Sequence, residues 1–329
     1  MIAMLLLVLA ACVEPLQSTV LPVSAAQSSP PRDAAAIATL RAAWREALEL
    51  DVPSEVLAGG AWIESASDAD PELLALFARA LASAGLAERA DALLGQKSAP
   101  PIALARARLA LDRDELEGAI RELAPPAGST ETVRFPAVPE AFLLLGRAHA
   151  RAGDLARAEP LLVEFVSRAP WHVEAPQAWF VLVDAALARG DSSGSASREQ
   201  SRAQSAEWHA FYRARRVQVR ANPSETLPRL GLAQLWLSAN ELERARAAVE
   251  SALAIDTRFC RGLELAAEIE RRAGCVEDAR SRADAALACD SKLVEVHLTL
   301  ARLARDAGDA TTSNVHVARY RELGGKKEL

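Results

Sequence analysis

The sequence predicts an all-α protein built from repeated helix pairs, and three observations carry that prediction. Hydrophobic residues make up 50% of the 329-residue chain, but aromatic residues only 5%. Alanine, leucine, arginine and glutamate dominate and favour helix, whereas valine, isoleucine and threonine are sparse. The chain also repeats itself with a period of 34 residues, which suits two helices and a turn. A large β domain is therefore not expected.

The repeats are clearest in the C-terminal half. Three segments align without a gap at this spacing and a fourth copy lies upstream; they begin at Thr226, Cys260, Val294 and Pro139. A further copy begins at Pro176 and is lengthened by a serine-rich insert over residues 192–207. We expect this insert to be a surface loop or a frayed helix.

Particular residues of the Pro139 copy identify the kind of repeat. Aromatic, leucine, glycine, alanine and terminal proline positions are filled by Phe142, Leu145, Gly146, Ala158 and Pro170. This pattern resembles the tetratricopeptide repeat. The resemblance implies a right-handed superhelical solenoid of antiparallel helix pairs, with small residues where the two helices of a pair touch. The turns are expected at Gly153, Asn240, Gly274 and Gly308, where a left-handed backbone is easily adopted.

The remaining chain is assigned around these repeats. Two degenerate copies are predicted over Pro71–Gln96 and Pro100–Pro125, and an earlier helix over Ala34–Leu50 carries Trp44 on its apolar face. The chain then divides into a signal peptide (1–11), a flexible tether (12–33), degenerate helical repeats (34–128), a linker (129–138) and the solenoid (139–329), whose repeats start at 139, 176, 226, 260 and 294.

The first residues are typical of a processing signal. Residues 2–11 form an apolar run that is too short to cross a bilayer, which needs about 20 residues, but suits an export signal. The sequence Leu9-Ala10-Ala11-Cys12 resembles a bacterial lipobox, whose cysteine is lipidated and becomes the mature N-terminus. No Lys or Arg precedes the run, so an ordinary signal peptide and an apolar N-terminus without a targeting role stay open.

A lipidated Cys12 would place the protein in the bacterial cell envelope, anchored to the membrane and facing the periplasm. Residue 13 is valine rather than aspartate. By resemblance to enterobacterial sorting, this favours the outer membrane.

Composition and motifs argue against catalytic activity and against the binding of nucleic acid, metals or phosphate groups. A formal net charge of −6 gives no basic surplus for binding nucleic acid. Residues 190–194 match the G-x-S-x-G pattern around Ser192, but a helix, not the required strand, is predicted before it. No two of the five histidines have i, i+4 spacing, and there is no phosphate-binding loop. We expect no catalytic residue, metal, cofactor or small-molecule substrate.

Three cysteines fall within one repeat. Cys260 opens its first helix and Cys289 ends its second, so an antiparallel pair would bring them together, while Cys275 lies at the opposite turn. A disulfide between the first two is possible if their Cα atoms come within about 7 Å. Three packed, reduced thiols are the expectation.

The resemblance also predicts where a partner would bind. Tetratricopeptide domains line their concave groove with the first helix of each pair, and the matching positions here are Arg147, Arg151, Phe180, Asp184, Leu187, Leu230, Gln234, Leu237, Glu268, Arg271, Arg272, Arg302 and Arg305. An apolar middle beside an arginine-containing end suits a peptide with a hydrophobic anchor and an acidic flank. The lysine and asparagine with which chaperone-binding members hold a terminal carboxylate are absent. Ordinary solvated surface is the alternative interpretation.

Two functions follow from these expectations. The first is a non-catalytic protein–protein interaction scaffold, tethered to the envelope and binding a protein or peptide in the groove. The second is a self-associating structural component, or an accessory subunit of an envelope enzyme complex. The sequence does not name the partner.

Overall fold

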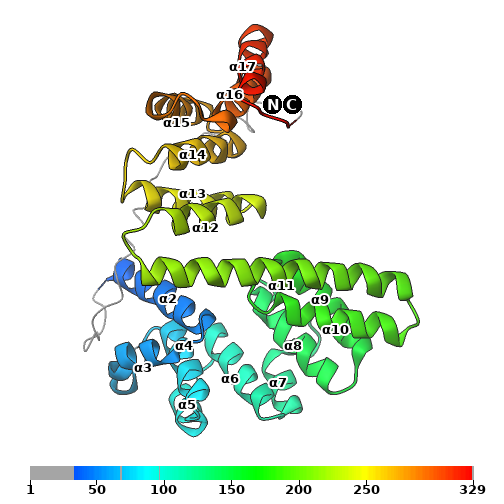
Figure 1. Ribbon diagram of the computed structural model, residues 1–329. Coiled ribbons are helices and arrows are strands. Elements are labelled where there is room, and N and C mark those ends of the chain that lie inside the picture. Colours follow the sequence, from blue (N-terminus) through cyan, green and yellow to red (C-terminus); the bar gives the residue numbers. More distant parts are fainter. Residues whose placement is uncertain (1–32, 67–68, 96, 328–329) are drawn as a thin grey trace. The chain divides into compact units, whose positions relative to one another are not determined.

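The computed structural model describes residues 33–66, 69–95 and 97–327, and within these ranges every regular element is a helix (Figure 1). Two compact units are present. The N-terminal unit ends at His209 and the C-terminal unit begins at Ala210, so the boundary falls inside one long helix. Each unit is described by itself.

The N-terminal unit begins with two α-helices and a 3₁₀ helix, which successive helix pairs follow. Its elements are α2 (Ala34–Glu49), α3 (Pro53–Gly60), the 3₁₀ helix η1 (Ala61–Ser65), α4 (Pro71–Ser83), α5 (Ala87–Leu94), α6 (Pro100–Asp112), α7 (Leu116–Leu123), α8 (Pro139–Arg151), α9 (Leu155–Arg168), α10 (Ala175–Ala188) and the first part of α11 (Ser192–Ala221). One hydrophobic cluster gathers around Trp44 and Phe77, and a second around Phe142 and Phe165.

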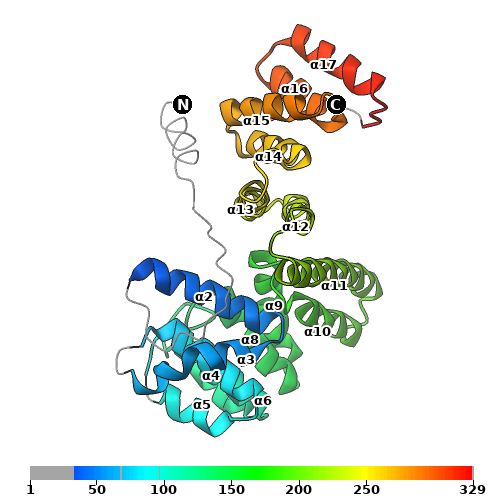
Figure 2. The same ribbon diagram turned by 60° about the vertical axis from the view of Figure 1, so that its left-hand side comes forward.

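The C-terminal unit contains the end of α11 and three helix pairs. These are α12 (Leu227–Ser238) with α13 (Leu242–Leu253), α14 (Cys260–Ala273) with α15 (Val276–Cys289), and α16 (Val294–Asp306) with α17 (Ala310–Glu322). The two helices of each pair lie side by side in both views (Figures 1 and 2).

The repeat register predicted from the sequence agrees with the structure. Helices α8, α14 and α16 begin at the predicted repeat starts Pro139, Cys260 and Val294. A side chain at Gly146 would meet Leu162 at 2.8 Å, so only a residue without Cβ lets α8 approach α9 this closely. The predicted all-α fold of antiparallel, tetratricopeptide-like helix pairs is confirmed.

The predicted turns also form where expected. Gly153, Gly274 and Gly308 have φ of 80°, 80° and 79°, and Asn240 has 59°. Glycine adopts this left-handed backbone freely and asparagine tolerates it, so these residues end the first helix of each pair.

The segment predicted as a linker packs into the N-terminal unit. Val133 is fully buried against the second hydrophobic cluster, and the amide of Arg134 donates to the carbonyl of Leu123 at 2.8 Å. Residues 129–138 therefore do not separate two bodies. The division between units lies instead at His209. The second hydrophobic cluster extends from Leu104 of α6 to Leu182 of α10 and so passes across this segment.

The serine-rich insert is not a loop. Residues 192–207 form the first half of α11, a continuous helix of 30 residues. The carboxylate of Asp191 accepts a hydrogen bond from the amide of Gly194 at 2.8 Å, which satisfies a free donor of the first turn. Ser195 and Ser205 are buried, so the insert has a packed face that its serine content concealed.

A disulfide joins Cys260 and Cys289, so the expectation of reduced thiols at this pair is wrong. Their Cα atoms lie 5.5 Å apart, within the range that a disulfide requires. The antiparallel geometry of α14 and α15 places the start of one helix beside the end of the other. The bond thereby ties the open end of the repeat, opposite the turn at Gly274.

Removing this disulfide should destabilise the C-terminal unit. The bond closes a loop between residues 29 positions apart, which corresponds to about 3–4 kcal/mol from restriction of the unfolded chain. We expect the Cys260→Ser/Cys289→Ser protein to unfold at lower urea concentration than the oxidised parent. Equal unfolding midpoints for the two proteins would contradict this expectation.

The N-terminal predictions lie outside the described residues. The apolar run, Cys12 and almost all of the predicted tether belong to residues 1–32, so signal peptide, lipidation and tether stay predictions. Within the described ranges, no helix combines the length and hydrophobicity needed to span a bilayer.

Candidate functional site

The predicted groove residues divide between the two units. Arg147, Arg151, Phe180, Asp184 and Leu187 belong to the N-terminal unit. The other eight belong to the C-terminal unit and are Leu230, Gln234, Leu237, Glu268, Arg271, Arg272, Arg302 and Arg305.

Three successive first helices of the N-terminal unit carry an arginine at the same position. Each of α4, α6 and α8 begins with a proline, and its ninth residue is Arg79, Arg108 or Arg147. These three arginines line one cavity of about 250 Å³. Of these three, only Arg147 was among the predicted groove residues, although the equal spacing from the three prolines was a signal for the other two.

Glu174, directly before α10, is the anion that holds two of these arginines. Arg108 donates from Nη1 to its Oε1 at 3.0 Å and from Nη2 to its Oε2 at 2.6 Å. Arg147 donates to Oε1 at 2.7 Å, and Arg108 also contacts Glu140. Burial by itself would raise the pKa of Glu174, but the hydrogen bonds and charge of Arg108, with the charge of Arg147, lower it to about 2.

Arg151 is likewise engaged within the unit. It donates to the carbonyl of Leu111 at 2.5 Å and to Asp114 at 2.7 Å, and so ties α8 to the turn between α6 and α7. Arg147 and Arg151 were predicted as groove charges, but both are occupied by intramolecular partners. Both arginines therefore connect α8 to neighbouring parts of the N-terminal unit.

Helix α10 presents the accessible part of the predicted groove in this unit. Phe180 and Leu187 are each 57% exposed, and Asp184 between them is exposed as well. Their spacing places them on one face of the helix. We call these three residues the α10 strip. It combines two apolar side chains with one negative charge.

Two predicted apolar groove residues of the C-terminal unit are core residues. Leu230 and Leu237 of α12 are only 6% and 7% exposed, whereas Gln234 between them is exposed. The prediction of a hydrophobic groove over α12 is therefore wrong for both leucines. The burial of these leucines could not be predicted from their position within the repeat, because it depends on which face of α12 neighbouring helices cover.

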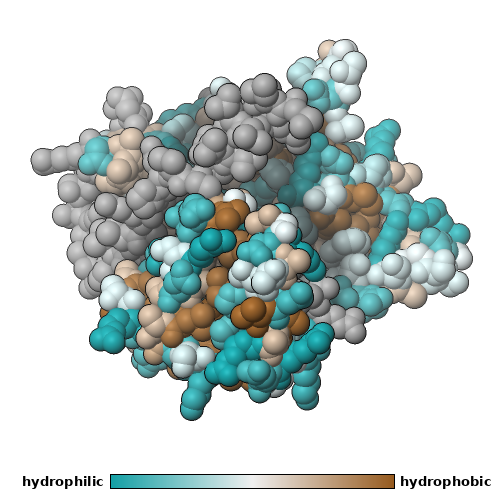
Figure 3. All heavy atoms as spheres, turned by 90° about the horizontal axis from the view of Figure 1, so that it is seen from above, coloured by the Kyte–Doolittle hydropathy of each residue, from teal (hydrophilic) through white to brown (hydrophobic). Residues whose placement is uncertain are grey.

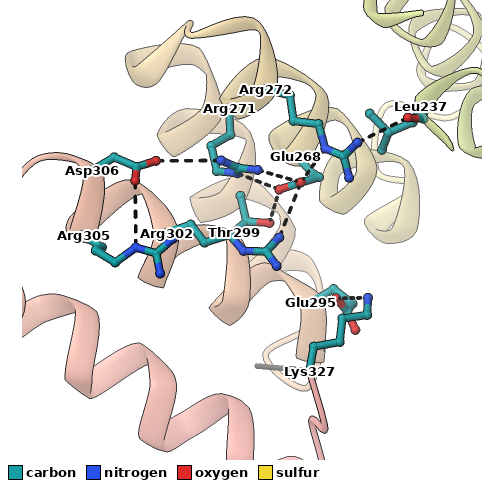
Figure 4. A network of polar contacts seen from close by, with 10 residues as sticks. All are labelled: Leu237, Glu268, Arg271, Arg272, Glu295, Thr299, Arg302, Arg305, Asp306 and Lys327. Atoms are coloured by element: carbon teal, nitrogen blue, oxygen red, sulfur yellow. Dashed lines mark hydrogen bonds and ion pairs between the residues drawn. The ribbon is translucent and has the colours of Figure 1, made fainter. Parts of the chain in front are cut away.

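Glu268 is contacted by three of the predicted groove arginines of the C-terminal unit (Figure 4). Arg271 donates to both of its carboxylate oxygens at 2.9 Å, and Arg272 donates to Oε1 at 2.9 Å. From α16, Arg302 lies 3.6 Å from Oε1, and the hydroxyl of Thr299 donates to Oε2 at 3.3 Å. One carboxylate thus joins α14 to α16.

Arg271 and Arg272 are consequently not the free charges that their place in the repeat suggested. The side chain of Arg271 is only 18% exposed and also lies 3.8 Å from Asp306. Arg272 reaches the carbonyl of Leu237 at 3.3 Å. Arg305, whose side chain is 53% exposed, is the most accessible of the predicted groove arginines in this unit.

Acid should destabilise both units through the half-buried Glu174 and Glu268. Burial would raise the pKa of Glu268, but hydrogen bonds from Arg271 and Arg272 lower it to about 2, as for Glu174. A lowered folded-state pKa gives stability that is complete above the ordinary value of 4.5 and is lost as the pH falls toward 2.

The expected loss is about 3 kcal/mol for each of the two sites between pH 5 and pH 2. Urea unfolding followed by circular dichroism at pH 7, 5 and 3 measures it. The midpoint should change little between pH 7 and 5 and fall clearly by pH 3. A midpoint that is the same at pH 5 and pH 3 would refute the assignment.

Ser192 does not lie in the strand–turn–helix geometry that the nucleophile pattern requires. Ser192 is exposed at the start of α11. The helix α10 precedes it, where the nucleophile pattern needs a strand.

One group of potential metal ligands lies in the C-terminal unit. Glu270, Cys275 and Asp278 lie close together, but Arg246 donates two hydrogen bonds to the carboxylate of Glu270.

One side-chain pair was not foreseen. His297 and His316 are 19 residues apart and their Nδ1 atoms lie 3.2 Å from each other. His297 is buried, and burial followed by the charge of His316 lowers its pKa.

Comparison with known proteins identifies no family. No protein-family profile matches the sequence, and no curated protein matches it. Many solved structures match, at low similarity.

Three of the matched structures illustrate that similarity. The MamA RS-1 ArsTM double mutant has a TM-score of 0.29 and 14% identity over 56% of this chain and 93% of its own. The complex of the TPR2AB domain of yeast Sti1 with pHSP90 gives 0.29 and 14% over 88% and 92%. Yeast Tom70 gives 0.32 and 11% over 91% of this chain, which spans only 62% of that protein. At these TM-scores no argument about function follows, and the fold class rests on the helix pairs themselves.

Proposed function

We propose that this chain is a non-catalytic scaffold that binds a protein or peptide partner through the first helices of its repeats. We further propose that a lipid on Cys12 holds it at a bacterial envelope membrane, facing the periplasm, with the outer membrane favoured by Val13. The anchoring part is supported by the apolar run and the lipobox-like residues of the sequence.

The α10 strip is the observation that carries the binding part. Two large apolar side chains, Phe180 and Leu187, are more than half exposed on a first helix, where the repeat architecture presents its groove. On the face seen from above, hydrophobic residues form small areas separated by hydrophilic ones (Figure 3). A few apolar anchors therefore suit a partner better than one broad hydrophobic contact would.

Capture of a partner from detergent-solubilised envelope tests the binding proposal. Phe180→Ala should reduce capture at every salt concentration, because it removes an apolar anchor. Val163→Ala is the matched control: Val163 is 43% exposed on the second helix α9, outside the strip. If Phe180→Ala and Val163→Ala capture the partner as well as the parent does, the α10 strip is not the binding site.

Two further measurements separate the alternatives. Sedimentation velocity of the purified chain tests self-association; a concentration-dependent oligomer that Phe180→Ala dissolves would favour a self-associating component over a scaffold. Incorporation of radiolabelled palmitate tests the anchor. Label that persists in Cys12→Ser would rule out lipidation at this residue.

A further inference from the structure

The last helix pair of the C-terminal unit holds two histidines against each other. His297 lies at the start of α16 and His316 in the middle of α17, on helices that run antiparallel from the turn at Gly308. Their Nδ1 atoms are 3.2 Å apart. Their ring centroids are 5.5 Å apart, farther than the nitrogens, so the two Nδ1 atoms lie on the facing sides of the rings.

The separation of these nitrogens suits two ligands of one metal ion. Zinc binds imidazole nitrogens at about 2.0–2.1 Å. A cation at that distance from both Nδ1 atoms would see them at an angle of about 100°, near the tetrahedral value. Such a cation lies beside the line that joins the nitrogens, so both rings would turn slightly to face it.

The surroundings keep both imidazoles in the neutral form, which is the form that binds metals. His297 is only 8% exposed, and burial lowers its pKa, as does the charge of His316. Burial lowers the pKa of His316 as well. Both rings are therefore mainly neutral near pH 7.

One side of the pair is accessible and lies near a negative charge. His316 is only half-buried, and Asp284 of α15, an exposed residue, acts on it through its charge. Arg319 acts on His297 with a positive charge, but it is exposed and lies 3.0 Å from Glu322. The accessible carboxylate of Asp284 favours the approach of a cation.

We propose that His297 and His316 bind one divalent transition-metal ion of the zinc type through their Nδ1 atoms. Imidazole ligands select such ions over magnesium and calcium, which prefer oxygen. The fold supplies two nitrogen ligands, so water and the carboxylate of Asp284 are left for the remaining positions. No metal was expected from the sequence, because the two histidines are 19 residues apart and belong to different helices.

The bound ion would join the two helices of the terminal pair. It would do so as the disulfide between Cys260 and Cys289 joins α14 to α15 in the preceding pair. Without metal, the same two nitrogens can share one hydrogen bond, which requires that one Nδ1 carries a proton and the other does not. The two states therefore differ in which ring nitrogens are protonated.

Imidazole NMR of the ¹⁵N-labelled full-length chain distinguishes these states. Zinc chloride added to the metal-free protein near neutral pH should shift the ring nitrogens of both histidines saturably. In the zinc-bound form both Nδ1 atoms should be unprotonated and both Nε2 atoms protonated, whereas one Nδ1 should carry a proton before zinc is added. Calcium chloride should produce no saturable shift.

Variants assign the binding to these side chains. In His316→Asn the amide can still hydrogen-bond to His297, but the imidazole ligand is gone, so zinc affinity should fall about tenfold or more. Asp284→Asn should lower it by about two- to fivefold, since a solvent-exposed charge contributes less. His149→Asn is the matched control, because His149 is a half-exposed histidine of α8 in the other unit, and it should leave the response unchanged.

Hydrogen exchange measured by mass spectrometry gives a second readout. Zinc should slow exchange in peptides from α16 and α17 of the parent but not of His316→Asn, because an ion that binds only the folded pair stabilises it. The proposal is overturned by the absence of a saturable zinc shift, by an equal response to calcium, or by equal zinc affinity of His316→Asn and the parent. If His316→Asn folds poorly, the protonation of the ring nitrogens in the parent with and without zinc decides.

Discussion

Replacing Glu174 with glutamine should lower the free energy of unfolding of the N-terminal unit by about 3–5 kcal/mol. The neutral amide keeps the size of the side chain but removes the charge that Arg108 and Arg147 share. Arg108 would then have only Glu140 as a counterion, with Arg79 and Arg147 nearby. Breaking a buried pair costs far more than breaking an exposed one, because the remaining charge stays out of water.

Hydrogen exchange measured by mass spectrometry assigns this loss to a unit. Peptides from α6 to α10 should exchange faster in Glu174→Gln, while peptides from α14 to α17 stay protected. Glu164→Gln is the matched control, since Glu164 pairs with Arg168 on the exposed surface of α9. Exposed pairs contribute at most about 1 kcal/mol. Equal protection of Glu174→Gln and Glu164→Gln would show that Glu174 is not structural.

The second large effect concerns the C-terminal unit. Reversing Arg271 and Arg272 together to glutamate should destabilise it by about 3–5 kcal/mol. The half-buried Glu268 would lose its bidentate partner and face two new carboxylates, with Arg302 as the remaining cation. This differs from what the repeat position suggests, namely a variant that folds like the parent and loses only partner contacts.

Urea unfolding and hydrogen exchange of peptides from α14 and α16 measure this effect. Arg305→Glu provides the control, because Arg305 is exposed and lies 4.0 Å from Asp306, at the limit of an ion pair. It should change stability by no more than about 0.5 kcal/mol. A double reversal as stable as Arg305→Glu would mean that Glu268 does not hold α14 to α16.

These two predictions show why partner binding and stability are difficult to separate in this chain. Most of the arginines that the repeat pattern assigns to the groove form intramolecular ion pairs, including Arg147, Arg151 and Arg271. Losing partner capture after their substitution would therefore not distinguish a binding defect from an unfolded repeat. Phe180 and Leu187 are better probes, because both side chains are 57% exposed and the described part of the molecule gives them no comparable structural task.

The sequence by itself determined the helical fold, the register of the repeats and the turns. These depend on local properties: helix propensity, the 34-residue spacing, and residues such as Gly146 and Gly274 that permit close approach or a left-handed backbone. Such properties act within one repeat, so they can be recognised without knowing what lies beside it.

Only the tertiary structure decided which groove residues are available. Arg108 and Glu174 are 66 residues apart and meet because α6, α8 and the start of α10 pack together. The burial of Leu230, Leu237 and Val133 likewise depends on neighbouring elements, and the Cys260–Cys289 bond on two helix ends that meet in space. Ion pairing and burial are set by contacts between repeats, and a periodic sequence pattern contains little information about those contacts.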